Sequence, residues 1–508
     1  MSAEQLYIDP EACIGCAACM WECPVGAIHD EFDLPAHLED YKEINAEYFV
    51  DNPLEVRDPM RTARRQLPEQ RPQLRVAVVG SGPSGCYAVD QLSSITGVEV
   101  TLIDMLPTPY GLARSGVAPD HLATKGIAKM FAKIIRRPNV RCLFNIHVGV
   151  DITMAELRET HHAVILATGA DTDRKLGIDG EDLAGSHSAR EFVSWYNGHP
   201  DHAGLEPDLS AERVVIIGNG NVALDAARLL VAEPDALRAS DMADHAVAAL
   251  STSAVREVVV VARRGVADAA YSASEFAALC QLDGVDVVAH PDEIGEDLAA
   301  DAVAQSFTGR RKLDLARTLP PPETRASTRR IVFRYGLTPE SIGGENRVES
   351  VTFRRTGADD SVSETLATGL VLRAIGYRSS PMPEVPFDDI AGTIAHDGGR
   401  IVADAGDGMY CVGWAKRGPS GVIGTNQVCA AETTEKLLAD FRDGKLPEPA
   451  HATSHVDDLL AERGTMVVRH DQWLSIDAAE LKSGQEAQRP RVKLVSVDDL
   501  LGTLNARL

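Results

Sequence analysis

Four cysteines near the amino terminus are spaced as ligands of a metal cluster. They form the run Cys13-x-x-Cys16-x-x-Cys19-x-x-x-Cys23, and Pro24 follows directly. Soft thiolates at this tight spacing wrap one iron–sulfur cluster. Zinc usually draws two separated pairs of ligands, so a zinc knuckle fits the spacing less well. The other five of the nine cysteines are scattered singly, which indicates a metal site in a reducing compartment and not a disulfide framework.

The type of this cluster has three alternatives. The segment resembles the second half of a bacterial ferredoxin, and in two-cluster ferredoxins the fourth cysteine of the run binds the other cluster. No second run exists in this sequence. Either Cys23 closes a single 4Fe–4S site, or the site holds a 3Fe–4S cluster, or the true start of the chain lies upstream. We favour the single 4Fe–4S cluster.

A glycine-rich turn at residues 80–85 has the pattern of a dinucleotide site. Gly80, Gly82 and Gly85 follow the apolar run 76–79 and open a helical pattern. Glycines here permit a tight turn and close backbone approach, and the helix amino terminus faces a pyrophosphate. Asp104 ends the next apolar run about 20 residues on, where an acid accepts from a ribose hydroxyl and selects against a 2′-phosphate. This site predicts FAD or NAD, and a purely structural turn is the alternative.

A second turn of this kind follows the apolar run 214–217. At the end of the later run 258–261, where an NAD site would carry an acid, stand Arg263 and Arg264. Guanidinium groups match a phosphate, so this site predicts NADPH, and a solvated arginine pair is the alternative. The turn itself reads Gly218-Asn219-Gly220-Asn221-Val222-Ala223, with alanine in the third glycine position.

The elements that carry these sites are those of a large α/β enzyme. At 508 residues, the usual ~150 residues per domain predicts about three domains. The runs 163–167, 258–262 and 369–374 are further candidates for buried parallel strands. A net charge of −25 argues against nucleic acid and acidic membranes as partners. The sequence has no basic and apolar leader and no apolar run of ~18 residues, so we expect a cytoplasmic protein without membrane insertion.

Three longer stretches resemble one known family. They are residues 109–121 (PYGLARSGVAPDH), 192–198 (FVSWYNG) and 413–423 (GWAKRGPSGVI). With the motifs above, they are similar to the adrenodoxin-reductase type of ferredoxin–NADP reductase, with an added ferredoxin-like module as in some actinobacterial members. The resemblance covers nearly the whole chain from residue 75. It implies an α/β fold with two Rossmann-like dinucleotide-binding domains, the second inserted in the first, behind a small ferredoxin-like iron–sulfur module.

This resemblance implies four segments. Residues 1–60, with fourteen acidic and two basic residues, form an acidic 4Fe–4S module, and the basic, proline-containing residues 61–75 form an exposed linker. Residues 76–175 and 370–508 form the FAD-binding domain. Residues 176–369 form the NADPH-binding domain.

The resemblance also assigns roles to single residues. His121 and Glu275 are the candidates for polar groups near the nicotinamide, where they would position it or handle a proton, and a structural role for each stays open. The residues expected to hold FAD are Gly80, Gly82, Gly85, Asp104, Leu112 and Val148, with Trp414, Gly421, Val422 and Ile423 near the isoalloxazine ring. Those expected to hold NADPH are Asn219, Gly220, Asn221, Val222, Arg263, Arg264, Glu275 and Gly421.

The implied activity is hydride transfer from NADPH to FAD, then single-electron transfer to an iron–sulfur ferredoxin, tethered or separate. The basic run Arg310-Arg311-Lys312 would dock an acidic ferredoxin, or it is a solvated helix face. A separate ferredoxin could serve a cytochrome P450, and we expect the chain to be a monomer or a weak oligomer.

Two other functions stay open. One is an NADPH-oxidising electron-input subunit of a larger enzyme, similar to the small subunit of glutamate synthase. The other is a non-catalytic redox sensor that binds FAD and a cluster. A disulfide reductase fits poorly, because it needs a Cys-x-x-Cys pair beside the flavin and no such pair follows Cys23.

Overall fold

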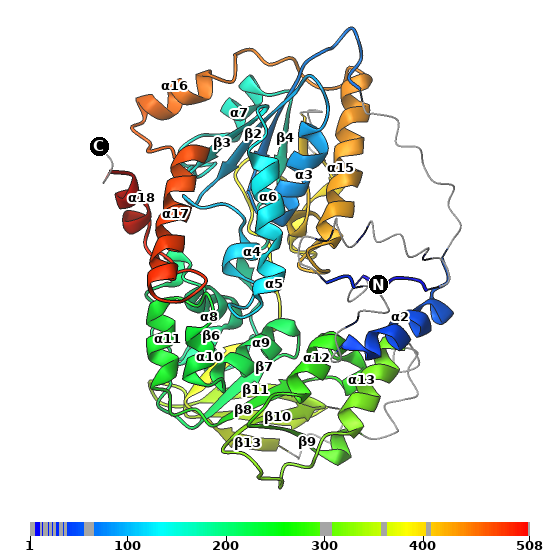
Figure 1. Cartoon of the computed structure of the whole chain (residues 1–508), viewed down its shortest axis with the longest axis vertical. Helices are drawn as coiled ribbons and strands as arrows, with labels where there is room; N and C mark the ends of the chain where they lie inside the picture. Colours follow the sequence, from blue (N-terminus) through cyan, green and yellow to red (C-terminus); the bar gives the residue numbers. More distant parts are fainter. Residues whose placement is uncertain are drawn as a thin grey trace.

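The computed structural model describes residues 6–10, 13, 19, 23, 27–29, 34, 38–54, 66–294, 307–356, 363–402 and 408–505. Two α/β units lie one above the other, and the amino-terminal helix α2 (Asp40–Asp51) lies beside the lower one (Figure 1). We call the upper one the first unit, built on a seven-stranded sheet, and the lower one the second unit, built on a six-stranded sheet. The second unit interrupts the first in sequence, which confirms the expected fold class.

The first unit contains a sheet whose central strands are parallel and buried. Its order is β18-β19-β20-β4-β1-β2-β3. Val76 and Val78 belong to the core on one face of this sheet, and Ala77 and Val79 to the core on the other, which is why β1 reads as a continuous apolar run. The strands are β1 (Leu74–Val79), β2 (Val98–Asp104), β3 (Val140–Phe144), β4 (Ala163–Leu166), β18 (His396–Asp397), β19 (Arg400–Ile401) and β20 (Met409–Cys411).

Helices from both ends of the chain cover this sheet. Helix α3 (Pro83–Ser93) carries proline in its first turn, where the missing N–H has no intrahelical partner to lose, and it packs beside α15 (Thr425–Arg442). The carboxy-terminal helices return to the same core, in which Trp473 and Leu500 pack with Leu74. These helices are α16 (His455–Glu462), α17 (His470–Glu486) and α18 (Val497–Asn505), and they lie along one side of the first unit (Figure 1).

The second unit contains a parallel sheet of order β6-β14-β7-β8-β10-β9. The prediction assigned residues from 370 onward to the FAD-type domain, but β14 pairs in parallel with β7 and therefore belongs to the second unit. The strands are β6 (Ser186–Ser188), β7 (Arg213–Ile217), β8 (Glu257–Ala262), β9 (Val285–Ala289), β10 (Arg329–Tyr335) and β14 (Leu370–Arg373). The helices around it include α8 (Ala189–Tyr196), α9 (Asn221–Leu230), α10 (Pro234–Arg238), α11 (Asp244–Ser251), α12 (Ala273–Cys280) and α13 (Phe307–Arg317).

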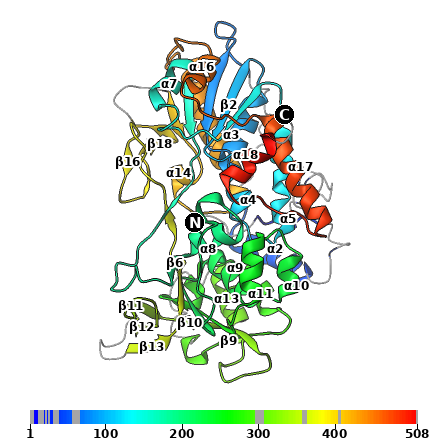
Figure 2. The same ribbon diagram turned by 90° about the vertical axis from the view of Figure 1, so that its left-hand side faces the viewer.

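An antiparallel meander extends the far end of the second unit (Figure 2). It consists of β11 (Leu337–Gly343), β12 (Ser350–Arg355) and β13 (Ser363–Ala367). Residues of β13 alternate between exposed and half-buried positions, as expected for a sheet with one face in water. The sequence analysis did not predict this sheet.

The described part of the predicted linker, residues 66–75, is docked against the first unit. Arg71 donates to the carbonyl of Phe441, in the last turn of α15, at 3.0 Å and pairs with Glu448, beyond that helix, at 2.6 Å. Strand β1 begins at Leu74, two residues before the predicted start, and Leu74 is fully buried. Within this stretch Arg71 and Leu74 therefore contact the first unit, while Gln66, Glu69, Gln70, Pro72 and Gln73 are exposed. None of the helices in the described ranges combines the length and apolarity that a membrane span requires.

A buried polar cluster joins the two units. Lys125, at the end of α5 (Leu122–Lys125), pairs with Asp241 at 2.7 Å and donates to Asn197 at 2.9 Å. Lys493 lies 3.4 Å from Asp241. Burial lowers the pKa of Lys493 well below its ordinary value, and the neighbouring Lys125 adds to this effect. Burial alone would raise the pKa of Asp241, but the two ammonium groups lower it.

Candidate functional site

The first glycine turn is shaped for close backbone approach. Gly80 has φ +103°, and a Cβ there would lie 2.4 Å from the Ala167 carbonyl oxygen. A Cβ on Gly85 would lie 1.9 Å from the Gly80 carbonyl oxygen. Gly82 is the N-cap of α3, so no side chain of its own covers the first N–H groups of the helix. The first N–H groups of a helix that follows such a turn can bind an anion such as a pyrophosphate.

Asp104 ends β2 beside this turn. Its carboxylate accepts from the Ser81 backbone N–H at 2.7 Å and from the Leu106 N–H at 3.0 Å. Burial raises the pKa of Asp104, although its hydrogen bonds, first the one from the Ser81 hydroxyl, oppose the rise. The side chain stays half-buried, so an oxygen can still accept from a ribose hydroxyl. Ser81 was missed by the sequence analysis, although it stands between the fingerprint glycines.

Two of the predicted FAD residues differ in what they can offer. Leu112 begins α4 (Leu112–Ser115) and is 41% exposed, next to Gly111, where a Cβ would lie 2.9 Å from the Gly82 Cα. The stretch 109–121 therefore lies against the glycine turn. Val148 has a buried side chain in the core of the first unit, so only its backbone can face a cofactor.

The carboxy-terminal stretch lies against the first glycine turn as well. Trp414 begins α14 (Trp414–Arg417) and its ring stacks on Tyr377 with centroids 6.0 Å apart. Gly421 has φ +81°, the Val422 N–H donates to the Thr425 hydroxyl at 3.1 Å, and Ile423 packs on the core of the first unit. Asn426, at the start of α15, accepts from the Ser84 hydroxyl of α3 at 2.8 Å, which joins this stretch to the turn.

Arg417 supplies an independent sign that a polar group is expected here. Its Nη2 donates to the Asn426 side-chain oxygen at 2.7 Å, while its Nε and Nη1 are buried and have no hydrogen-bond partner within the described ranges. Buried guanidinium groups are almost always paired, so these donors fit an anionic group of a bound cofactor. Arg417 lies in the stretch that carried the family resemblance, but it was not predicted as a site residue.

The second glycine turn has the same shape. Gly218 has φ +115°, and a Cβ there would lie 2.2 Å from the Ala374 carbonyl oxygen. Gly220 is the N-cap of α9, Asn221 is its first residue, and Val222 packs on the core of the second unit. The side-chain oxygen of Asn221 accepts from the Ser272 N–H at 2.8 Å, and that of Asn219 accepts from the Ala270 N–H at 3.3 Å. The two asparagines thus tie the turn to the segment before α12.

The arginine pair follows β8 at the carboxyl edge of the second sheet. Both side chains are exposed, and Arg264 makes only a long contact of 3.6 Å with Asp268. The Arg263 carbonyl accepts from the Thr356 hydroxyl at 3.0 Å, which fixes the backbone and leaves the guanidinium in solvent. Exposed guanidinium groups at this edge fit a 2′-phosphate.

His121 and Glu275 come together between the units with a third residue, Asp225. One ligand-type atom of each lies within 4.8 Å of the others. Arg228 Nη2 donates to His121 Nε2 at 3.1 Å and to Asp225 at 2.6 Å, and Arg228 also pairs with Asp120. Because a guanidinium only donates, this contact requires Nε2 to accept, as in the tautomer that carries its proton on Nδ1.

Asp225 and Arg228 were missed by the sequence analysis. Burial and the neighbouring Glu275 raise the pKa of Asp225, and burial lowers the pKa of Arg228. The three ligand-type groups could hold a cation, but the Arg228 guanidinium already supplies the positive charge there. The available signal was a pair of charges three residues apart on the otherwise apolar helix α9.

The cysteine run is described only in part. Cys13 and Cys19 are exposed and Cys23 is half-buried, while Cys16 lies outside the described residues. Cys23 Sγ accepts from the Ala27 N–H at 3.3 Å, a contact of the kind that stabilises cluster thiolates. The sulfur atoms of these accessible cysteines can serve as ligands to the iron atoms of a cluster.

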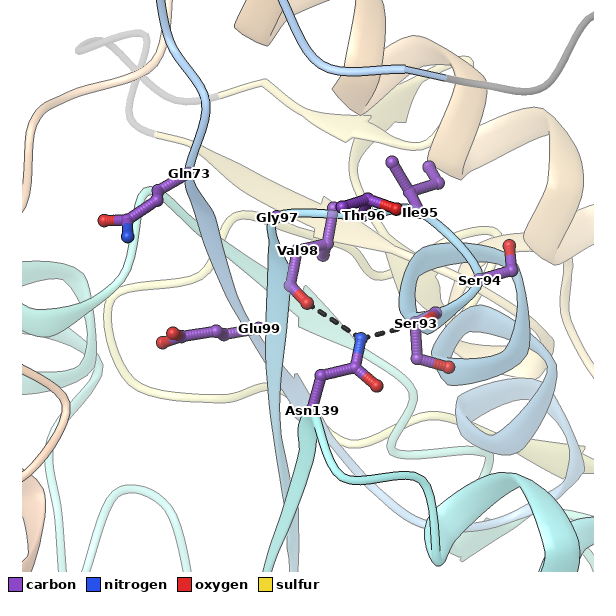
Figure 3. Close-up of a pocket in the computed structure, with 9 residues that line it drawn as sticks. All are labelled: Gln73, Ser93, Ser94, Ile95, Thr96, Gly97, Val98, Glu99 and Asn139. Carbon is purple, nitrogen blue, oxygen red and sulfur yellow. Dashed lines mark hydrogen bonds between the residues drawn. The ribbon is translucent and has the colours of Figure 1, made fainter.

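One cavity lies away from these residues. It has a volume of about 400 Å³ and opens at the amino-terminal edge of the first sheet, where Asn139 donates to the carbonyls of Ser93 and Val98 (Figure 3). The glycine turns lie at the opposite, carboxyl edges of the sheets, and no predicted site residue lines this cavity.

Two uncapped helix termini, one beside an acid and one beside two arginines, define an oxidoreductase with two dinucleotide-binding folds. A family model for pyridine nucleotide-disulphide oxidoreductases matches residues 74–288, and one for the 4Fe-4S binding domain matches residues 6–29, which include all four clustered cysteines.

Comparison with known proteins identifies the family. The chain is 44% identical to a probable ferredoxin/ferredoxin–NADP reductase of Mycobacterium tuberculosis, over 98% of this chain and 88% of that protein. It is 36% identical to the mitochondrial NADPH:adrenodoxin oxidoreductase of Arabidopsis thaliana, over 84% and 95% of the two chains. The solved structure of M. tuberculosis FprA in complex with NADPH matches with a TM-score of 0.80 at 41% identity, over 85% of this chain and 99% of that one. The chain belongs to the ferredoxin–NADP reductase family.

Proposed function

We propose that this chain is an NADPH-dependent ferredoxin reductase that uses FAD and carries its own iron–sulfur cluster. The observation that carries the proposal is the difference between the two glycine turns, since Asp104 stands beside the first and Arg263 with Arg264 beside the second. The acid suits FAD and the arginines suit NADPH. When bound, NADPH would supply a hydride, and FAD would supply the ability to pass on its two electrons one at a time.

In this proposal the chain's own residues hold FAD along the first turn. The N–H groups at the start of α3 bind the pyrophosphate and Asp104 binds the ribose. Leu112 and the Val148 backbone line the cofactor, and Arg417 supplies buried donors. Trp414 and residues 421–423 enclose the ring end and exclude water.

NADPH is held along the second turn. The N–H groups at the start of α9 bind its pyrophosphate, and Arg263 and Arg264 bind the 2′-phosphate. His121 and Glu275 hold the nicotinamide end, and Arg228 orients the His121 ring by donating to Nε2. This arrangement keeps a proton on Nδ1.

The iron–sulfur group is a single 4Fe–4S cluster held by Cys13, Cys16, Cys19 and Cys23, with a 3Fe–4S cluster as the other outcome. Its matched segment and the accessible thiols support this assignment. The final acceptor is an iron–sulfur ferredoxin, and delivery onward to a cytochrome P450 and a monomeric or weakly associated chain belong to the same proposal.

An anaerobic NADPH titration followed by absorbance and EPR tests the function. We expect FAD to be reduced first and the cluster signal to follow within one chain, with iron and sulfide content giving the cluster type. A protein that binds FAD but does not oxidise NADPH in the presence of ferricyanide would contradict the proposal and favour a sensor. Copurification of a large catalytic partner would favour the electron-input subunit.

A further inference from the structure

Helix α2 of the amino-terminal module and helix α13 of the second unit have opposite charge. Helix α2 contains four acidic residues and one basic residue, and α13 contains four basic residues and one acidic residue. The two helices lie side by side at the edge of the second unit (Figure 1). The chain as a whole is strongly acidic, so α13 is a local basic surface that an acidic helix complements.

Among the described residues, two ion pairs connect these helices, one at each end of α2. Arg310 donates to Asp51 at 2.8 Å, and Arg311 lies 3.6 Å from Asp40. The third member of the predicted basic run, Lys312, is not part of this surface. It is buried and donates to the Ala269 carbonyl at 3.0 Å. Arg310 and Arg311 therefore contact α2, whereas Lys312 packs inside the second unit. We call the surface formed by Arg310 and Arg311 the basic surface.

A third contact connects α2 to α12. The Tyr41 side chain of α2 hydrogen-bonds to Ser274, the residue before Glu275 in α12. Ser274 in turn lies 3.1 Å, oxygen to oxygen, from Ser272, whose N–H donates to Asn221 of the second glycine turn. The docked helix thus adjoins the residues proposed to hold the nicotinamide end of NADPH.

The start of the module is attached to α2 and reaches the first unit. Tyr7 stacks on Tyr48 with ring centroids 3.7 Å apart, and the Ile8 N–H donates to the Asn45 side chain at 2.9 Å. A Cβ added to Gly424 at the amino end of α15 would lie 3.3 Å from Leu6. The module therefore contacts the second unit through α2 and the first unit through Leu6.

We propose that α2 is the docking element of the iron–sulfur module, which it seats on α13 and α12 through Asp40, Asp51 and Tyr41. The chain's own module then occupies the basic surface. A free acidic ferredoxin has to compete with this module for the same surface. The tether makes docking intramolecular, so modest ion pairs suffice to populate the docked state. The inference rests on the proposed function only for its electron-transfer consequence.

The stability of α2 provides a readout that needs no redox chemistry. The helix has twelve residues and none of them is buried. Helices shorter than about 12–15 residues are marginal in water by themselves, so the backbone of α2 is protected from hydrogen exchange mainly through docking. Exchange rates of the α2 amides in the full-length holoprotein therefore report the docked fraction.

The test compares two charge-reversal variants of α2. In D40K/D51K both ion pairs become repulsive, and we expect exchange of the α2 amides to accelerate about tenfold. The matched control E43K/E47K makes the same charge change at exposed positions of the same helix, and we expect wild-type exchange. The fourfold variant D40K/D51K/R310E/R311E restores opposite charges and should recover protection. Equal exchange in D40K/D51K and in the control would overturn the proposal.

Turnover with an acidic ferredoxin from another source tests the competition. If α2 covers the basic surface, D40K/D51K lowers the KM for that ferredoxin by more than E43K/E47K does. An equal decrease in both variants would show a general charge effect and would contradict coverage of this surface. Because the exchange experiment uses no NADPH, a failure of docking and a failure of the proposed reductase activity give different results.

Discussion

At the scale of single residues, the motifs predicted the two glycine turns but not the residues that meet between the units. Gly80 and Gly218 were recognisable because their local turns require positive φ. Asp225 and Arg228 were not, because their partners, His121 and Glu275, come from distant parts of the chain. No spacing rule connects residues 121, 225 and 275, and only the packing of α9 against both units brings them together.

The arginine pair allows a prediction about coenzyme preference. Replacing Arg263 and Arg264 by serine removes the groups proposed to bind the 2′-phosphate. A hydrogen bond to a charged group contributes about 1.5–3 kcal/mol, so we expect kcat/KM for NADPH to fall roughly 10- to 100-fold. The kcat/KM for NADH should change little, because NADH lacks that phosphate.

Steady-state kinetics with ferricyanide and both coenzymes measures this change. The matched control is Arg238→Ala, because Arg238 is an exposed arginine on α10 that pairs with Asp235. An unchanged ratio of NADPH to NADH activity in the double serine variant would mean that the pair is only a solvated surface.

At the scale of elements, buried parallel strands were the most predictable part of the fold. The runs at 163–167, 258–262 and 369–374 correspond to β4, β8 and β14. Strands buried on both faces appear in the sequence as unbroken apolar runs. The meander β11–β13 has one solvent-exposed face, so its sequence contains no such run. Assigning β14 to a unit failed because its own sequence does not reveal its neighbours, β6 and β7.

One element contact predicts a pH dependence. His161 follows α7 (Met154–Thr160), is 1% exposed and lies with Nε2 2.9 Å from the Thr101 hydroxyl of β2. Burial lowers the pKa of His161 to about 4. The unfolded chain therefore binds a proton that the folded chain resists. Its contribution to the free energy of unfolding is complete above about pH 6.5 and falls as the pH drops toward 4.

Urea unfolding at pH 7 and pH 5 checks this effect. We expect the wild-type free energy of unfolding to decrease between these values by up to roughly 1–2 kcal/mol more than that of His161→Gln, which cannot take up the proton. His451→Gln, a substitution at an exposed histidine, is the control and should follow the wild type. Parallel curves for wild type and His161→Gln would count against a buried neutral imidazole.

At the scale of the whole molecule, the two units are joined by charges that no local pattern could reveal. Lys125 comes from the first unit, Asp241 from the second and Lys493 from the carboxy-terminal segment. The sequence indicated two dinucleotide-binding units through their repeated motifs, but their contact depends on residues more than a hundred positions apart. A second cluster, Arg114 and Arg491 on the buried Glu480, ties the same carboxy-terminal segment to the stretch 109–121.

The Asp241 cluster leads to a prediction about how the units are held together. Asp241→Asn leaves two buried ammonium groups without their carboxylate. Removing one partner of a buried ion pair costs about 3–5 kcal/mol, so we expect a clear loss of thermal stability at pH 7. Because burial already lowers the pKa of Lys493, this lysine loses its proton more readily as the pH rises. The stability loss of Asp241→Asn should therefore shrink toward pH 9.

The double variant D241N/K493M, which removes one ammonium group as well, should be more stable than Asp241→Asn alone at pH 7. Differential scanning calorimetry at both pH values distinguishes these outcomes, and an Asp241→Asn protein as stable as wild type at pH 7 would show that this cluster does not hold the units together.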